Sequence, residues 1–175
     1  MPFHLDTERL RIRPLDTDDL DALLEMYGDP EFNRRIHNET APGLLEMAHY
    51  VEWHIECQET LGYAMWGVEE KDSGLFVGDC GFFPLEWQGP EIELAYHLHP
   101  DSWGKGYATE AARACLRYGL KHYKKPIVAV VHPDNGTSRR VLEKIGMELD
   151  REKIIYGTQM MLYRPRQIKK GTRTF

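Results

Sequence analysis

The sequence predicts an α+β fold in which a mixed, mostly antiparallel sheet contains one parallel pair of strands and carries helices on both faces. Three β-like stretches between residues 63 and 99 are joined only by short turns, which predicts an antiparallel meander. A helical stretch then separates residues 92–99 from the apolar run 126–132, and a strand–helix–strand unit of this kind makes a right-handed crossover between parallel strands. The unbroken apolar run is typical of a strand covered on both faces. The predicted order is β-α-α-β-β-β-α-β-α-β-β.

The first part of the chain is predicted from alternation and capping. In T-E-R-L-R-I-R-P-L, apolar residues alternate with arginines, which predicts a half-buried strand. Asp16 or Thr17 caps the helix that follows, whose first turn is acidic, and a Gly-Asp-Pro triplet ends it. The next stretch is polar, with two prolines and two adjacent arginines, and predicts a loop. The predicted boundaries are a strand at 7–15, helices at 16–27 and about 43–60, and a loop at 29–42.

The rest of the chain is predicted from turns and helical spacing. K-D-S-G and Q-G-P separate the strands of the meander. From Ala108 onward, apolar residues fall on one helical stripe whose first half is small, so this helix should lie close to the sheet. N-G-T-S-R-R-V-L-E-K-I-G predicts a short helix closed by Gly146. The predicted boundaries are strands at 63–70, 75–87 and 92–99, a helix to 123, a strand at 126–132, a helix at 135–146, and strands near 148–155 and 157–164.

Composition limits the class of protein. A chain of 175 residues, 29% charged and 42% hydrophobic, predicts one globular domain, which we place at residues 1–164. No run approaches ~18 consecutive apolar residues, and the N-terminus lacks a basic-then-apolar leader, so we expect a cytoplasmic protein without a membrane partner. The three cysteines are scattered and include no C-x-x-C pair, which disfavours a disulfide framework and a zinc site.

The net charge of −6 conceals an asymmetry. The last twelve residues carry five basic side chains and no acidic one, so the first 163 hold 17 basic and 28 acidic residues. An acidic body disfavours nucleic acid as a partner and favours a cationic or amine substrate. The basic tail at 165–175 is either a frayed terminus or a contact arm.

The stretch H-P-D-S-W-G-K-G-Y-A-T stands where a loop becomes a helix. The first N–H groups of a helix have no intrahelical acceptor and attract anions. Gly104 and Gly106 leave room for a phosphate beside them, and Lys105 adds charge. A plain helix start that needs glycine for its backbone geometry is the alternative. The pattern G-x-x-x-x-G-K-[S/T] is absent and the loop follows a meander, so a P-loop NTPase and a dinucleotide-binding fold are disfavoured.

Four motifs together resemble the GNAT N-acetyltransferases, in the branch of the ribosomal-protein N-terminal alanine and serine acetyltransferases. W-G-K-G-Y-A-T-E-A is similar to the acetyl-CoA motif [Q/R]-x-x-G-x-[G/A], with Gly106 and Ala108 at the small positions and Trp103 where Gln or Arg is usual. Residues 135–146 resemble the helix N-x-x-S-x-x-x-x-E-K-x-G, and 92–98 resemble the strand E-[I/L]-[G/A]-Y. T-E-R-L-R-I-R-P-L resembles the opening strand, so the resemblance covers nearly the whole chain.

The resemblance implies acetyl-CoA as the co-substrate, without a metal. Backbone N–H groups of the glycine loop would hold the pyrophosphate. The strand ending at His99 would splay from the parallel strand and pair with pantetheine, and the N-x-x-S helix would line the far side. The residues implied in CoA binding are His97, Leu98, His99, Gly104, Lys105, Gly106, Tyr107, Ala108, Thr109, Asn135 and Ser138.

Acetyl transfer to an amine predicts Glu93 and Ser138 as catalytic residues. An amine is mostly protonated at pH 7, and Glu93 could take its proton directly or through water; otherwise it is a solvated strand residue. His97 is a rival base or a packing histidine, and a backbone N–H near Leu98 could bind the oxyanion. Many family members place an acidic tyrosine four residues before the glycine that ends the second helix. Here that residue is Leu142, so Ser138 is the substitute donor to the thiolate, or an ordinary polar residue of a helix start.

The acceptor is expected to be the amine of a small molecule or a peptide. Residues 29–42 and the segment Y-G-T at 156–158 are its candidate walls, and Trp53, Trp66 and Trp87 form either an aromatic pocket or part of the core. The family leads us to expect a homodimer. Two other functions stay open, namely a homologue that binds acyl-CoA without catalysis and an unrelated phosphoanion-binding enzyme.

Overall fold

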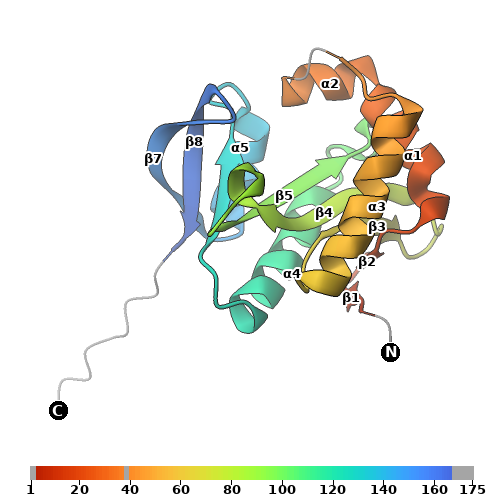
Figure 1. The fold of residues 1–175 in the computed structure, drawn as a ribbon, viewed down its shortest axis with the longest axis horizontal. Helices are drawn as coiled ribbons and strands as arrows, with labels where there is room; N and C mark the ends of the chain where they lie inside the picture. The colour runs from red at the N-terminus through yellow and green to blue at the C-terminus, as the bar shows by residue number, and fades with distance from the viewer. Residues whose placement is uncertain (1–2, 38–39, 167–175) are drawn as a thin grey trace.

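The computed structural model describes residues 3–37 and 40–166 and confirms the predicted class, an eight-stranded mixed sheet with helices on both faces (Figure 1). The strands lie in the order β1-β2-β3-β4-β5-β6-β8-β7, and β5 and β6 form the parallel pair. The strands are β1 (Leu5–Asp6), β2 (Leu10–Pro14), β3 (Met65–Glu70), β4 (Phe76–Pro84), β5 (Ile92–Leu98), β6 (Ile127–Val131), β7 (Met147–Ile155) and β8 (Thr158–Pro165). The α-helices are α1 (Leu20–Gly28), α2 (Pro30–Ile36), α3 (Leu44–Thr60), α4 (Tyr107–His122) and α5 (Gly136–Lys144), with short 3-10 turns at Thr17–Asp19, Leu85–Trp87 and Pro100–Ser102.

The prediction of a loop at 29–42 is wrong over α2. The side chain of Asp29 accepts hydrogen bonds from the backbone N–H groups of Glu31 and Phe32, at 2.7 and 3.0 Å, and so caps this helix. Pro30 occupies the first helical turn, where a missing N–H has no cost. The Gly-Asp-Pro triplet therefore ends one helix and begins the next. The two-residue strand β1 was not predicted either, and the predicted strand 75–87 ends in a 3-10 turn.

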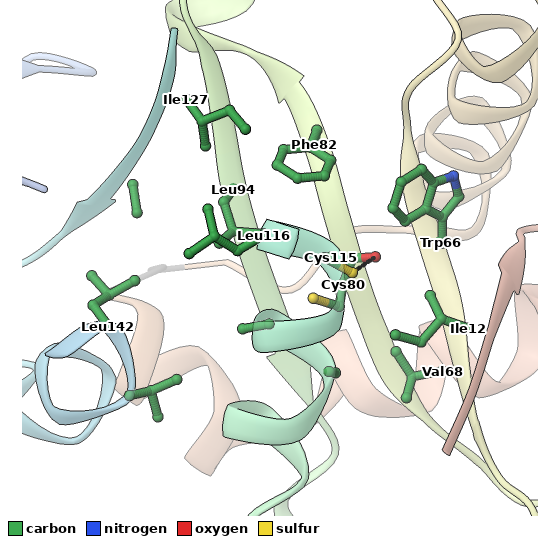
Figure 2. Close-up of a cluster of buried hydrophobic side chains, with 14 of the residues drawn as sticks. Ile12, Trp66, Val68, Cys80, Phe82, Leu94, Cys115, Leu116, Ile127 and Leu142 are labelled. Atoms are coloured by element: carbon green, nitrogen blue, oxygen red, sulfur yellow. Dashed lines mark hydrogen bonds between the residues drawn. The ribbon is translucent and has the colours of Figure 1, made fainter. Parts of the chain in front are cut away.

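The helices cover the sheet unequally. α4 and α5 pack on one face with a large apolar core that includes Trp66, Phe82 and Leu116 (Figure 2), and α1, α2 and α3 enclose a second core on the other. α4 lies close to the sheet, as its small residues predicted, since a Cβ on Gly119 would come within 2.7 Å of the Phe82 ring. The predicted apolar stripe is buried as far as Gly119, whereas Leu120 is 56% exposed.

The parallel strands part in the middle of the sheet. β5 and β6 pair only at Ile92 with Ile127 and at Glu93 with Val128, although β5 continues to Leu98. Beyond that point β6 pairs only with β8, which lies on its other edge, from Ala129 to Val131. The splay implied by the resemblance is therefore present, and the diverging strand ends leave room for a site.

Within the part of the chain that the structure describes, the helices are too short or too polar to cross a membrane. β8 ends at Pro165, and residues 167–175 of the predicted basic tail lie outside the described residues.

Candidate functional site

A cavity of about 310 Å³ opens between the end of β5 and the N-termini of α4 and α5. α2 closes it from above with Phe32, Arg35 and Ile36. Most residues expected to bind CoA line this cavity, namely His97, Leu98, Gly104, Gly106, Tyr107, Ala108, Thr109, Asn135 and Ser138. The fold thus brings these residues, which the resemblance implied in CoA binding, around one space.

The glycine loop needs its glycines for the backbone as well as for space. Gly104 and Gly106 have φ of 75° and 82°, in the left-handed region that side chains disfavour. Gly106 is the N-cap of α4, and no side chain caps the first turn, so the N–H groups of that turn remain available to a ligand. Both interpretations of the loop are therefore compatible, because the glycines provide the turn and also leave the helix start uncovered.

Two residues predicted in CoA binding do not line the cavity. Lys105 has an exposed side chain, and its carbonyl accepts a 2.8 Å hydrogen bond from Arg9, whose guanidinium also pairs with Glu110. His99 lies beyond the end of β5, where its Nδ1 accepts a hydrogen bond from the backbone N–H of Asp101 at 3.2 Å. These contacts fix the base of the loop from outside.

Trp103 occupies the position where the family motif has Gln or Arg, and it ties the loop to β5. Its indole N–H donates to the carbonyl of Leu98 at 2.8 Å, and the guanidinium of Arg35 lies 3.9 Å from its ring centroid. The N–H of His99 donates to Val77 on β4, and backbone groups alternate along a strand, so the N–H of Leu98 faces the space between β5 and β6. This places a backbone donor at the wedge.

Asn135 and Ser138 line the opposite wall, at the start of α5. The side chain of Asn135 caps this helix by accepting from the N–H of Ser138 at 3.1 Å and donates to the carbonyl of Arg35 at 3.4 Å. The hydroxyl of Ser138 lies 2.8 Å from that of Tyr96, which also donates to the Ser138 carbonyl at 3.0 Å. Tyr96 was not among the predicted site residues, and it supplies a phenol where the family's usual tyrosine position is Leu142.

A second cavity of about 560 Å³ continues from the first. Tyr96, His97, Asn135 and Ser138 line both cavities. Glu93 lines only the second and is 5% exposed, with its Oε2 accepting a 2.5 Å hydrogen bond from the hydroxyl of Tyr156. Burial raises the pKa of Glu93 to about 7, against the opposing effect of the Tyr156 hydrogen bond. Glu93 is therefore a buried carboxyl group that can take or release a proton near neutral pH.

His97 is held by a buried carboxylate that the sequence analysis did not identify. Asp79 on β4 is fully buried, and its Oδ1 lies 2.7 Å from Nδ1 of His97. Its Oδ2 accepts from the hydroxyls of Tyr50 and Tyr27, at 2.8 and 3.2 Å. Burial opposes the charged imidazolium, but the Asp79 carboxylate outweighs it and raises the pKa of His97. Because Nδ1 faces Asp79, Nε2 is the ring atom left for a ligand.

Two signals could have revealed these missed residues. Asp79 is a lone carboxylate inside the apolar strand V-G-D-C-G-F-F, and a charge in such a position needs a partner. Tyr96 lies in the same strand as Glu93 and next to His97. Of the three tryptophans weighed for an aromatic pocket, Trp66 is fully buried in the core and Trp87 lines the second cavity.

Comparisons with known proteins show the family and the fold. A family model described as acetyltransferase (GNAT) domain matches residues 9–148. The uncharacterized protein YkkB of Bacillus subtilis is 33% identical over 146 residues, which cover 82% of this chain and 84% of YkkB. A crystal structure of an acetyltransferase from Agrobacterium tumefaciens has a TM-score of 0.81 at 27% identity and covers 95% of this chain and 96% of that one. RimL, a ribosomal L7/L12 α-N-protein acetyltransferase solved with coenzyme A, has the same fold at a TM-score of 0.76 and 16% identity, over 92% and 96% of the two chains.

Proposed function

We propose that this chain, which belongs to the GNAT acetyltransferase family, moves the acetyl group of acetyl-CoA onto a primary amine by direct attack in a ternary complex. The observation that carries the proposal is the junction of the two cavities, where Tyr96, His97 and Ser138 line both. A thioester reaching through the first cavity would end at this junction, and an amine in the second would meet it beside Glu93.

The first cavity fits the pyrophosphate and pantetheine of acetyl-CoA. The uncapped N–H groups at the start of α4 suit an anion, and the left-handed glycines keep side chains away from them. Beyond Glu93, β5 stays paired with β4 but no longer with β6, so its edge toward β6 offers backbone groups to an extended arm. When bound, acetyl-CoA supplies the activated acetyl group, and the remaining chemistry belongs to the protein.

Glu93 accepts the proton that the attacking ammonium group must lose. A base works best when its pKa lies near the operating pH, and burial brings the pKa of Glu93 to about 7. His97 is the weaker candidate for this role, because Asp79 favours its protonated form. We assign His97 instead as a donor through Nε2, which stabilises the negative charge that develops on the thioester oxygen together with the N–H of Leu98.

Ser138 and Tyr96 stabilise the leaving thiolate. Their hydroxyls lie 2.8 Å apart on the wall shared by both cavities. Burial raises the pKa of Tyr96, so its hydroxyl stays protonated and can donate a hydrogen bond to the sulfur, which Leu142 cannot do. Tyr96 thus gives the sulfur a hydrogen-bond donor, with Ser138 orienting it.

Replacement of Ser138 with alanine should lower kcat at least about tenfold with little change in the KM for acetyl-CoA. Tyr96→Phe should give a similar loss, and the double variant should lose less than the product of the two, because the hydroxyls act as one unit. Steady-state kinetics with thiol detection measures all three. Turnover within twofold of wild type in Ser138→Ala would remove Ser138 from the mechanism.

Replacement of Gly106 with alanine should weaken CoA binding at least about tenfold, because a side chain at a φ of 82° strains the backbone from which α4 starts, and its Cβ would lie 3.4 Å from the Arg9 guanidinium. Gly146 provides a matched control, since its φ is 93° and a Cβ there would meet no atom within 4 Å. Gly146→Ala should carry a similar backbone strain, of about 1 kcal/mol, yet keep the affinity for CoA. Calorimetric titration compares the two. Equal CoA affinities in both variants would contradict the assignment of the loop.

The test of the function as a whole is an acceptor screen. The protein is mixed with acetyl-CoA and a panel of small amines, polyamines, peptides and aminoglycosides, and the free thiol is followed. Release that depends on an amine supports the transferase. Saturable CoA binding with no thiol release for any acceptor would favour the acyl-CoA-binding homologue instead.

A further inference from the structure

The mouth of the second cavity has an aromatic wall built around Trp87. This side chain is 59% exposed, although it stacks on Phe83 at a centroid distance of 5.0 Å and an angle of 20°. Trp53 supports it edge-on at 5.6 Å, and the ring of Tyr156 lies 6.2 Å away. A large apolar ring that stays exposed beside other rings offers a surface to a ligand.

Unfavourable backbone geometry concentrates at this cavity. Among the described residues, the non-glycine positions with positive φ are His37, Glu86, Trp87 and Tyr156, at 57°, 51°, 63° and 54°. Three of these residues line the second cavity, and the backbone N–H of the fourth, Glu86, donates to the hydroxyl of Tyr156 at 3.1 Å. Residues other than glycine rarely adopt such conformations, and those that do cluster where function requires a side chain to be held in a particular orientation.

The positive φ of Tyr156 lets its side chain contact both Glu93 and Trp87. It shares the two-residue turn between β7 and β8 with Gly157, whose φ is 73°, and this type of turn prefers Asn or Gly at both positions. The tyrosine there reaches Glu93 with its hydroxyl and contacts Trp87 with its ring. The carboxyl group and the exposed indole are thus separated by about one tyrosine side chain.

The charges around the cavity narrow the class of acceptor. Among the described residues that line it, Glu93 is the one carboxylate and Arg35 the one guanidinium, accompanied by His37, His54, His97 and His132. A polyamine carries several positive charges and would meet a single carboxylate here. A monoamine avoids this mismatch.

We propose that the second cavity selects a primary monoamine joined by a short linker to a planar aromatic ring, with the ring against Trp87 and the amine at Glu93. The proposal rests on the transferase function and specifies its acceptor class. The cavity volume of about 560 Å³ is in the range of pockets that hold one drug-sized molecule.

The test compares amines that carry an aromatic ring with amines that lack one. Values of kcat/KM are measured with 2-phenylethylamine, tryptamine, hexylamine, spermidine and a tetrapeptide with a free N-terminus. The ring-bearing amines should exceed hexylamine at least about tenfold, the size of a good aromatic contact. Spermidine should be used more poorly still.

Variants of Trp87 test whether this side chain causes the preference for amines that carry a ring. Trp87→Leu should lower kcat/KM for tryptamine about tenfold and that for hexylamine clearly less, with the KM for acetyl-CoA within twofold of wild type. Trp87→Phe keeps a ring and should restore most of the loss. Thermal unfolding shows that each variant is folded.

The outcomes separate the two proposals. Thiol release with none of the five amines and with no acceptor of the wider screen would overturn the transferase function. Release with an acceptor of the wider screen but with none of the five would overturn the aromatic acceptor alone. Use of hexylamine, spermidine or the peptide as well as tryptamine would overturn the aromatic acceptor and leave the transferase intact. An equal loss for all amines in Trp87→Leu would also overturn it.

Discussion

Replacing Glu93 with glutamine should lower kcat by a factor of about 100 to 1,000, the range expected when a general base is removed. Glutamine keeps the size of the side chain and an oxygen that can accept from the Tyr156 hydroxyl, so the cavity stays intact while the proton acceptor is lost. The KM for acetyl-CoA should stay within about twofold, because Glu93 does not line the first cavity. Steady-state kinetics with the best acceptor of the screen measures both values.

The same variant carries a second signature in its pH dependence. Wild-type kcat should rise with pH through about 7 as Glu93 ionises, and this rise should be absent from the residual activity of Glu93→Gln. The effect on stability has the opposite direction. Burial raises the pKa from 4.5 to about 7, so the carboxyl group stabilises the fold fully below its unfolded pKa and loses this contribution as the pH rises through about 7.

Glutamine is neutral at every pH, so the variant should match wild type near pH 4 and be more stable than wild type by about 3 kcal/mol at pH 8. Denaturant unfolding at the two pH values checks this. An inactive but more stable variant would show that the lost activity does not come from a damaged fold. Unchanged kcat in Glu93→Gln would move the role of base elsewhere, with His97 as the remaining candidate.

Much of the lining of the first cavity could be predicted because it depends on local signals. The glycine loop, the helix start after it and the N-x-x-S helix each lie within a short stretch, and the crossover rule for parallel strands brings them to the same end of the sheet. The splay after Glu93 follows from the resemblance and is present in the pairing of β5 with β6. Local chemistry and topology together were sufficient here.

The structure differs from the predictions where one local sequence signal is compatible with two structures. Asp29 and Pro30 end α1 and also begin α2, because an acidic N-cap followed by proline is a helix start as well as a stop. In an ideal strand, residues 97 and 99 face the same side. His99 leaves this pattern because the chain turns into a 3-10 helix at Pro100, and the histidine side chain caps that turn.

The groups around His97 and Glu93 could not be predicted from local patterns, since they meet only through the tertiary fold. Tyr27 comes from α1, Tyr50 from α3 and Asp79 from β4, while Tyr156 reaches Glu93 from the turn between β7 and β8. In sequence, each is an ordinary core or turn residue. Only the charge of Asp79 in an apolar strand marks its site as unusual.

Replacing Asp79 with asparagine should lower kcat about 100-fold, because His97 would lose the carboxylate that favours its protonated form, which is the form that we propose donates to the thioester oxygen. Besides Asp79 on β4, the groups that face His97 are Tyr27 on α1, Tyr50 and His54 on α3, and Glu93 on its own strand. Burial lowers the pKa of His54 to about 4, so this ring is neutral and does not replace the lost interaction.

Asparagine fits the same space and keeps an oxygen for the Nδ1–H of His97, while the tyrosine hydroxyls can turn to accept from its amide. The variant should therefore keep the fold around His97 but lack the negative charge of Asp79. Without Asp79, burial dominates and the pKa of His97 falls below that of wild type. NMR titration of the imidazole measures this shift directly.

Asp79→Asn should be less stable than wild type over a defined range of pH. In wild type the raised pKa of His97 stabilises the fold fully below the unfolded pKa of 6.5, and this contribution is lost as the pH rises through the folded value. Asp79→Asn should therefore be destabilised most at acidic pH and least in alkaline solution.

Tyr50→Phe separates the charge of Asp79 from its hydrogen bonds. It removes one 2.8 Å donor to Asp79 but leaves the carboxylate, so the pKa of His97 should remain raised and kcat should fall only a few-fold. If Asp79→Asn shifts the pKa of His97 while kcat and its pH profile remain those of wild type, the buried pair serves only the fold. A large loss in Asp79→Asn beside a small one in Tyr50→Phe identifies Asp79 as the positioning residue that favours the protonated form of His97 at the junction of the two cavities.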